Sequence, residues 1–373
     1  MSEQSNLWLT YFGRRPTNLL PLGAMLMIVL VCSAAAVAAD DSEVISRVAF
    51  GSCVHQDKPQ PIWDAIVATR PEMFLLIGDN IYGDSSDMAV LRAKYAKLGA
   101  QPGYQRLLSA CPIHATWDDH DYGLNDGGVE FAQKAASQQV FNDFFHVPAD
   151  SPRRHRAGVY DALLVGPPGK RVQVILLDTR YFRSPLRRWT SGKRNGAGPY
   201  LPNEAAEATM LGPAQWAWLE KQLSVPAELR IIASSVQVVA EQHGWEMWAN
   251  FPRERQRLFQ LIRDANADGV LMISGDRHLA EISRLAPTVE GPAYPLFDVT
   301  SSSLNVPSGG GNENEVNRHR LGEHYPGVNF GTVSIDWSQS DPQVQMAIHD
   351  VAGAIVRRES VALSALKAPT AAP

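Results

Sequence analysis

Short apolar runs that end in small or acidic side chains recur along this chain, and they limit its possible folds more than any other feature. Buried strands are predicted at residues 44–50, 74–77, 113–117, 172–177, 230–236 and 270–274. Segments of helical period lie among them, at residues 61–69, 88–98, 129–145, 213–223 and 253–265. Strands that alternate with helices predict a layered α/β fold.

The end of the chain differs, because helical patterns stop after Glu281 and only strand-like runs follow. These runs lie at residues 297–300, 332–337 and 344–348. A series of strands after an α/β region predicts a second sheet that packs on the first. Long irregular loops are expected at residues 183–202 and 307–311, where loops of this length often border a functional site.

The first 39 residues form a separate segment. Arg14 and Arg15 precede an apolar run at residues 19–39, which ends in alanines. A basic start, an apolar centre and a small-residue end predict a cleaved export signal, and the paired arginines make the twin-arginine route one option. The same run is long enough to stay as a membrane anchor. We therefore expect an exported protein (periplasmic, secreted or outer-surface), with one domain at residues 40–366 and a loose tail at residues 367–373.

Composition excludes several classes of protein. With 45% hydrophobic residues, the chain has enough apolar surface to offset the entropy of ordering, which excludes a disordered protein. The formal net charge is −5 and no basic block is present, so we expect no stable nucleic-acid complex. Three cysteines cannot build a disulfide scaffold of this size. A globular protein large enough to be an enzyme remains.

Side chains that can carry chemistry follow four of the predicted strands. They lie in Gly51-Ser52-Cys53, Gly78-Asp79-Asn80-Ile81-Tyr82, Trp117-Asp118-Asp119-His120-Asp121 and Gly275-Asp276-Arg277-His278. Ligands of open α/β sheets bind at the carboxyl ends of the strands, so we expect these segments to meet at one edge. Thiol, phenol, imidazole and carboxylate groups are all metal ligands. Because carboxylates this close repel one another unless a cation lies among them, the sequence predicts a shared metal site.

The two cysteines beyond the export segment are placed differently. Cys53 follows the first predicted strand, whereas Cys111 precedes the strand at residues 113–117. They should therefore lie at opposite ends of strands, on the order of 15–20 Å apart. A disulfide allows only about 7 Å between Cα atoms. We expect Cys53 to be a metal thiolate and Cys111 a small buried apolar residue.

The four segments resemble the alkaline phosphatase D (PhoD-like) family of the calcineurin-like metallophosphoesterases, over residues 48–305. The resemblance implies a four-layer α/β/β/α sandwich of two packed mixed sheets flanked by helices, with the metal site at the carboxyl edge of the strands. It implies iron (Fe³⁺) and calcium as cofactors, with another divalent metal as an alternative. The implied ligands are Cys53, Tyr82 and His278 on iron, Asp79 between the metals, and Asp118, Asp119 and Asp276 on the second metal.

The resemblance also implies a mechanism without a covalent enzyme intermediate. A metal-bound hydroxide attacks phosphorus in line with the leaving oxygen, and His120 matches the position of the protonating histidine. We expect neighbouring Asp121 to raise the pKa of His120 and to orient it. Arg180 is a candidate to hold non-bridging phosphate oxygens. The wider superfamily has a histidine near residues 234–237, and its absence here favours a hard ion such as calcium and makes Gln237 a candidate ligand.

Three functions remain open from the sequence. The preferred one is a secreted alkaline phosphomonoesterase that acts on small-molecule or lipid phosphoesters. The second is a phosphodiesterase, phospholipase D-like or acting on teichoic-acid or nucleic-acid diesters, because specificity depends on loops such as residues 183–202. The third is a calcium-stabilised surface binding protein without turnover, which has no use for His120 as an acid. The natural substrate and the oligomeric state cannot be read from the sequence.

Overall fold

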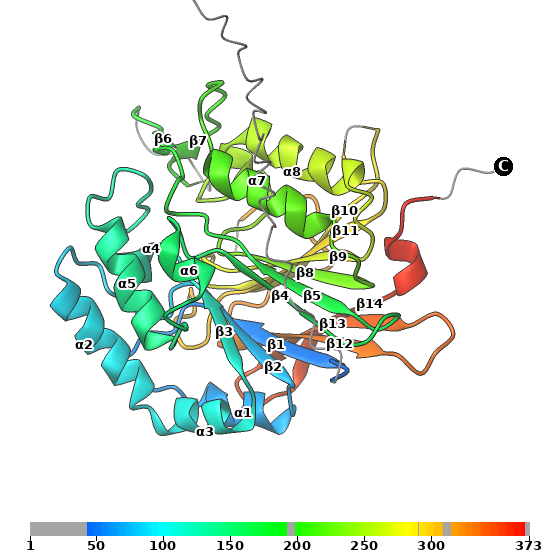
Figure 1. Ribbon diagram of the computed structural model, residues 1–373, viewed down its shortest axis with the longest axis horizontal. Coiled ribbons are helices and arrows are strands. Elements are labelled where there is room, and N and C mark those ends of the chain that lie inside the picture. The colour runs from blue at the N-terminus through cyan, green and yellow to red at the C-terminus, as the bar shows by residue number, and fades with distance from the viewer. Residues whose placement is uncertain (1–42, 192–197, 290, 309–314, 370–373) are drawn as a thin grey trace, which may run out of the picture. The chain divides into compact units, whose positions relative to one another are not determined.

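Two six-stranded mixed sheets form the centre of the fold (Figure 1). The computed structural model describes residues 43–191, 198–289, 291–308 and 315–369, so the predicted export segment lies outside the described residues. The first sheet, in the order β14-β13-β12-β1-β2-β3, consists of β1 (Arg47–Gly51), β2 (Met73–Ile77), β3 (Ile113–Thr116), β12 (Asn329–Asp336), β13 (Gln343–Asp350) and β14 (Ile355–Ala362). The second sheet, in the order β10-β11-β9-β8-β5-β4, consists of β4 (Asp161–Val165), β5 (Val172–Leu176), β8 (Leu229–Ser234), β9 (Val270–Ser274), β10 (Ala280–Leu285) and β11 (Leu296–Ser301).

Helices cover the outer face of each sheet (Figure 1). Those on the first sheet are α1 (Ile62–Ala68), α2 (Met88–Gly99), α3 (Pro102–Ala110) and α5 (Lys134–Phe144). Those on the second sheet are α7 (Gly212–Leu223) and α8 (Pro252–Asp264). Short elements complete the described chain: α4 (Asp119–Tyr122), α6 (Pro152–His155), η1 (Trp248–Asn250), η2 (Leu363–Leu366) and the ladder of β6 (Arg187–Arg188) with β7 (Tyr200–Leu201). The predicted four-layer α/β/β/α sandwich is confirmed.

The side chains of β1 alternate between the two faces of the first sheet, and this alternation explains why the sheet lies between two cores. Val48 and Phe50 lie in the core that the first sheet shares with β8, β9, α7 and α8. Ala49, between them, lies in a second core with side chains of α1, α2 and α3. Successive side chains of a strand point to opposite faces, so β1 is buried on both sides and separates the two cores.

The strands at the end of the chain do not form a sheet of their own, so the predicted make-up of the second sheet is wrong. Instead, β12 pairs antiparallel with β1, with Val48 opposite Val333, and β13 and β14 extend the same sheet. The reason is that β2 occupies only one side of β1. Unpaired N–H and C=O groups on the other side would lose their hydrogen bonds in the interior. The second sheet is built from the middle of the chain, β4 to β11.

Three further features differ from the prediction. The helix expected at residues 129–145 begins at Lys134, because Val129 donates its N–H to the Arg183 carbonyl and Phe131 to that of Gly128. These bonds hold the preceding residues in a loop. Helix α3 lies where no helix was predicted, and the irregular loop at residues 183–202 contains the β6–β7 ladder.

The direction of the strands sets the position of the functional groups. Strands β1, β2 and β3 are parallel neighbours, so their carboxyl ends lie at one edge of the first sheet. In the second sheet, β9 runs parallel to β8 and β11.

Cys53 and Cys111 are both buried and unbonded to each other, as predicted. Within the described ranges, no helix combines the length and the apolar character needed to cross a membrane.

Candidate metal centre

Four of the predicted ligands occupy left-handed backbone positions directly after strands. Cys53 follows β1 with φ 59°, and Asp79 follows β2 with φ 51°. Asp276 and His278, after β9, have φ 68° and 56°. Residues with a side chain rarely adopt this conformation, and where they do the surrounding structure must enforce it. The clustering of such residues at adjacent strand ends of the two sheets points to a functional site.

A first group of ligand atoms combines sulfur, oxygen and nitrogen. The Cys53 thiol, an Asp79 carboxylate oxygen and a His278 ring nitrogen all lie within 4.8 Å of one another. Cys53 Sγ lies 3.3 Å from Asp79 Oδ2. The Tyr82 hydroxyl lies 3.3 Å from His278 Nε2. The structure thus brings together the four residues that the resemblance places on iron.

Two neighbouring groups contain mainly carboxylates. One consists of Asp118, Asp119 and Asp276, and the other of Asp79, Asp119 and His120, again with ligand atoms within 4.8 Å. Asp79 belongs both to the group with Asp119 and His120 and to the group with Cys53 and His278. It therefore lies between the two halves of the centre, where a bridging ligand is expected.

The electrostatics of these groups fit bound cations. Asp79 Oδ1 and Asp118 Oδ2 are buried, and among the described residues neither has a hydrogen-bond partner. Burial, then the neighbouring Cys53 and Asp119, raises the pKa of Asp79 well above its usual range. Burial and Asp118 do the same for Asp276. Buried carboxylates of this kind are normally paired or coordinate a metal, so the residues fit a metal centre.

Neutral imidazole and thiol groups complete the donor set. Burial and the adjacent Arg277 lower the pKa of His278 to about 4, so its ring is neutral at ordinary pH. Neutral imidazole is the form that binds metals. Burial raises the pKa of Cys53 to about 12, although hydrogen bonds with Ser302 and Ser52 oppose the shift. The raised pKa favours the neutral thiol, and a metal ion reverses this preference because it binds the thiolate.

His120 is oriented by a residue other than the one predicted. Its Nδ1 lies 2.7 Å from Asp84 Oδ1, and its ring lies 4.1 Å from that of Tyr82 between centroids. Although burial works in the opposite direction, Asp79, Asp84 and Asp119 raise the pKa of His120 to about 10. Asp84 lies in a loop without a motif, and no sequence signal distinguishes it from an ordinary turn residue.

In the described part of the chain, the His120 ring bonds Asp84 and the Asp121 carboxylate bonds other groups, so the predicted orienting role of Asp121 is wrong. It is fully buried and accepts the Asp118 N–H at 2.7 Å, the Asn80 amide at 2.6 Å and the Tyr95 hydroxyl at 3.2 Å. The first of these bonds caps the N-terminus of α4. Asp121 therefore holds the acidic loop in place from behind the site.

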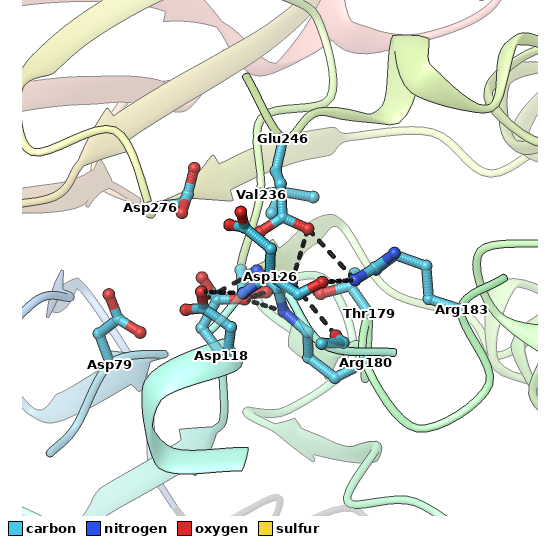
Figure 2. Close-up of polar contacts among 12 residues, drawn as sticks. Asp79, Asp118, Asp126, Thr179, Arg180, Arg183, Val236, Glu246 and Asp276 are labelled. Atoms are coloured by element: carbon cyan, nitrogen blue, oxygen red, sulfur yellow. Dashed lines mark hydrogen bonds and ion pairs between the residues drawn. The ribbon is translucent and has the colours of Figure 1, made fainter. Parts of the chain in front are cut away.

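Arg180 is placed to balance carboxylates, in contrast to the predicted contact with phosphate. Its side chain is 0% exposed. Nε donates to Asp118 Oδ1 at 2.5 Å, and Nη1 donates to Glu246 Oε1 at 2.6 Å. Figure 2 shows the guanidinium group between these two carboxylates, with Arg183 beyond Glu246. A buried cation with two carboxylate partners stabilises the loop that carries Asp118.

Other residues of the centre were given no role by the sequence analysis. Glu246, from the segment before η1, lies within 4.8 Å of Asp119 and Asp126 through its carboxylate. Ser235, after β8, donates to Asp118. Gln237 donates its amide N–H groups to Glu281 at 2.7 Å and Thr300 at 2.8 Å, and its role as a ligand stays a prediction.

Comparisons with known proteins agree with this architecture. The family model for PhoD-like phosphatases matches residues 48–346. Alkaline phosphatase D of Bacillus subtilis (strain 168) is 22% identical over 258 residues, which cover 64% of this chain and 43% of that protein. The chain thus spans less than half the length of this curated relative.

Solved structures show the same fold. The structure of PhoD superposes with a TM-score of 0.67 at 16% identity, covering 87% of this chain and 70% of that one. GAP50, the anchor in the inner membrane complex of Plasmodium, superposes with a TM-score of 0.50 at 12% identity, covering 88% of this chain and 90% of that one. At these identities the likeness establishes the fold alone, and function has to be argued from the site.

Proposed function

The chain belongs to the PhoD-like phosphatase family, and from this premise we propose that it is a metal-dependent phosphomonoesterase. The proposal rests on the way that possible metal ligands meet. Three strands of the first sheet and one of the second end at adjacent groups of ligand side chains, and Asp79 belongs to two of these groups. The choice of a monoester is supported by the relative that is an alkaline phosphatase. A diesterase is the alternative that the test below separates.

We assign iron to Cys53, Asp79, Tyr82 and His278. The second metal, calcium, is assigned to the carboxylates of Asp118, Asp119 and Asp276, with Asp79 shared. The assignment follows ligand chemistry, since thiolate and imidazole suit a transition metal and clustered carboxylates suit calcium. When bound, such a pair supplies Lewis acidity toward phosphoryl oxygens and makes a water molecule more acidic.

His120 is the proposed proton donor to the leaving oxygen. Its Nδ1 is engaged by Asp84 at 2.7 Å, which leaves Nε2 as the nitrogen available to a substrate. The raised pKa keeps the ring protonated near neutral pH, as a general acid requires. Asp84 acts as a positioning residue, because it fixes the ring and stabilises the imidazolium without reaching the substrate itself.

Export remains part of the proposal. It is supported by the composition of residues 1–39, where paired arginines precede an apolar run that ends in alanines. The expected observation is a mature protein that begins after residue 39 and is found outside the cytoplasm. Mass spectrometry of the protein from a fractionated host tests it, and retention of residues 19–39 in the membrane fraction would indicate an anchor.

Metal analysis and substrate comparison test the enzymatic proposal. We expect iron and calcium in protein purified without added metals, together with a visible tyrosinate band. Hydrolysis of 4-nitrophenyl phosphate should exceed that of bis(4-nitrophenyl) phosphate, disappear on chelation and return on adding metals back. A preference for the diester would identify a phosphodiesterase, and a metal-loaded protein that cleaves neither would be a binding protein.

The variant His120→Asn tests whether His120 is the general acid or takes no part in the reaction. Loss of a general acid lowers kcat by about 10²–10⁴-fold, and the metal content should stay unchanged. The control His155→Asn alters an exposed histidine that bonds the Ala149 carbonyl on the surface, and its kcat should equal that of the unchanged protein. Equal rates for both variants would remove His120 from the mechanism.

A further inference from the structure

An exposed tryptophan lies beside the metal centre. Trp245 is 43% exposed. It lines a pocket of about 250 Å³ together with Arg277, His278 and Ser308. Because His278 is one of the proposed iron ligands, this pocket adjoins the place where a phosphoryl group would be held. Aromatic side chains beside a few polar groups are typical of ligand-binding pockets.

The backbone that carries Trp245 is held by hydrogen bonds from several directions. Its N–H donates to Nδ1 of the buried His243 at 3.1 Å. Gly198 donates to the His243 carbonyl at 2.7 Å, and Tyr200 donates to the Gly244 carbonyl at 2.8 Å. Gly244 itself has φ 71°, a conformation that suits glycine. The indole is thus presented from a fixed loop, which reduces the entropy lost when a ligand packs against it.

Arg277 packs against the indole ring and lines the same pocket. Its guanidinium carbon lies 5.2 Å from the centroid of the Trp245 ring. Glu315 fixes the guanidinium through bonds of 2.9 Å to Nε and 2.7 Å to Nη2. The pairing leaves Arg277 electrically balanced and 7% exposed, so its main contribution at this point is to hold the ring. The rest of the indole borders the pocket.

We propose that Trp245 stacks on an aromatic ring in the leaving group, so that the preferred substrates are phosphoesters of alcohols that carry a planar ring. The inference rests on the proposed phosphatase function and adds the substrate class. The pocket is smaller than the roughly 300–1,000 Å³ of sites for larger ligands, which suits one ring system. A nucleobase and a phenyl group share this chemistry.

A matched pair of esters tests the proposal. 2-Phenylethyl phosphate and 2-cyclohexylethyl phosphate have the same kind of alkyl leaving oxygen and differ in whether the ring is planar. Stacking on an aromatic side chain should favour the phenyl ester by about 10-fold in kcat/KM. Trp245→Ala should bring this ratio close to one. Trp245→Phe should keep part of it, and this variant retains a ring if the alanine variant does not fold.

The control variant is Trp189→Ala. Trp189 is 40% exposed, nearly as much as Trp245, and is also held near the β6–β7 ladder, with its N–H bonded to the Pro199 carbonyl at 2.7 Å. It does not line the pocket beside His278. The ratio between the two esters should be the same in this variant as in the unchanged protein. An equal fall in both tryptophan variants would overturn the proposal.

Binding measurements provide a readout that does not depend on turnover. Calorimetry of the metal-loaded protein with 2-phenylethylphosphonate and 2-cyclohexylethylphosphonate should show the same preference and the same dependence on Trp245. Comparing adenosine 5′-monophosphate with ribose 5-phosphate then tells whether a nucleobase is accepted in place of a phenyl ring. Equal affinities for the two phosphonates would overturn the proposal. If the protein binds the phenyl phosphonate selectively but hydrolyses neither ester, the phosphatase function is contradicted, and the stacking of an aromatic ring on Trp245 is still supported.

Discussion

Replacing Arg180 tests whether this residue supports the site or binds the substrate. The side chain is fully buried and joins Asp118 and Glu246, at 2.5 and 2.6 Å. In Arg180→Met, Asp118 would lose this buried cation, and Glu246 would keep only Arg183, at 3.4 Å. Removal of one partner from a buried ion pair destabilises a protein by about 3–5 kcal/mol. With a denaturant dependence of about 3 kcal/mol per M, the urea midpoint should fall by about 1–2 M.

A second arginine of the same chain provides the control. Arg106 pairs with Asp64 at 2.7 Å, a similar separation, but the two side chains are 54% and 66% exposed. Because solvent screens such a pair, Arg106→Met should lower the stability by about 0–1 kcal/mol. Both variants remove an arginine that is paired with carboxylate, and they differ in burial and in the number of carboxylate partners. Chelated and metal-loaded samples should both be measured.

The outcome separates two accounts of Arg180. If Arg180→Met is destabilised well beyond Arg106→Met and binds less metal, the result supports Arg180 as the cation that balances Asp118 and Glu246. Arg180→Lys should restore only part of the stability, because an ammonium group cannot match the two-carboxylate geometry of a guanidinium. An Arg180→Met protein that is as stable as Arg106→Met but has a raised KM would refute this reasoning and return Arg180 to phosphate binding.

Three more predictions follow from the site. Asp84→Asn should lower kcat by about 10–100-fold for alkyl phosphates without loss of metal, because His120 loses the carboxylate that orients its ring and stabilises its protonated form. The matched control Asp87→Asn keeps an N-cap side chain on α2 and should leave both kcat and the melting temperature close to those of the unchanged protein. Cys53→Ser should lose most of the iron and keep calcium in elemental analysis, whereas Cys111→Ser should keep both, and equal iron in the two would exclude Cys53 as a ligand. Burial raises the pKa of Asp121 to about 8, and that of Asp79 well above its usual range. In metal-free protein these groups hold protons that the unfolded chain releases near pH 4, so the melting temperature should fall as pH rises from about 6.5 to about 8, above the range in which buried neutral histidines such as His278 have the opposite effect. Saturating metal should flatten this dependence, and a chelated protein whose melting temperature rises over the same range would contradict the burial of neutral carboxylates.

Much of the fold could be predicted because its signals are local. The runs that became β2 and β9 are continuous apolar segments of strand length, and α7 and α8 show helical spacing with a proline at the first turn. The pairing of β12 with β1 could not be predicted in this way. It joins residues almost 300 positions apart (Arg47 and Ser334), and nothing in either strand specifies its partner.

The sequence by itself determined most of the metal-ligating groups of the centre and that they follow strands, since residue type and strand position are local properties. It was sufficient to predict that Cys53, Asp79, Tyr82, His120 and His278 would meet. Only the tertiary structure decided what each polar group contacts. Asp84 reaches His120 across 36 positions, Arg180 reaches Asp118 across 62, and Asp121 turns to Asn80 across 41. Such contacts depend on how loops from separate strands pack at the sheet edge, where a buried charge takes whichever partner lies within hydrogen-bond distance.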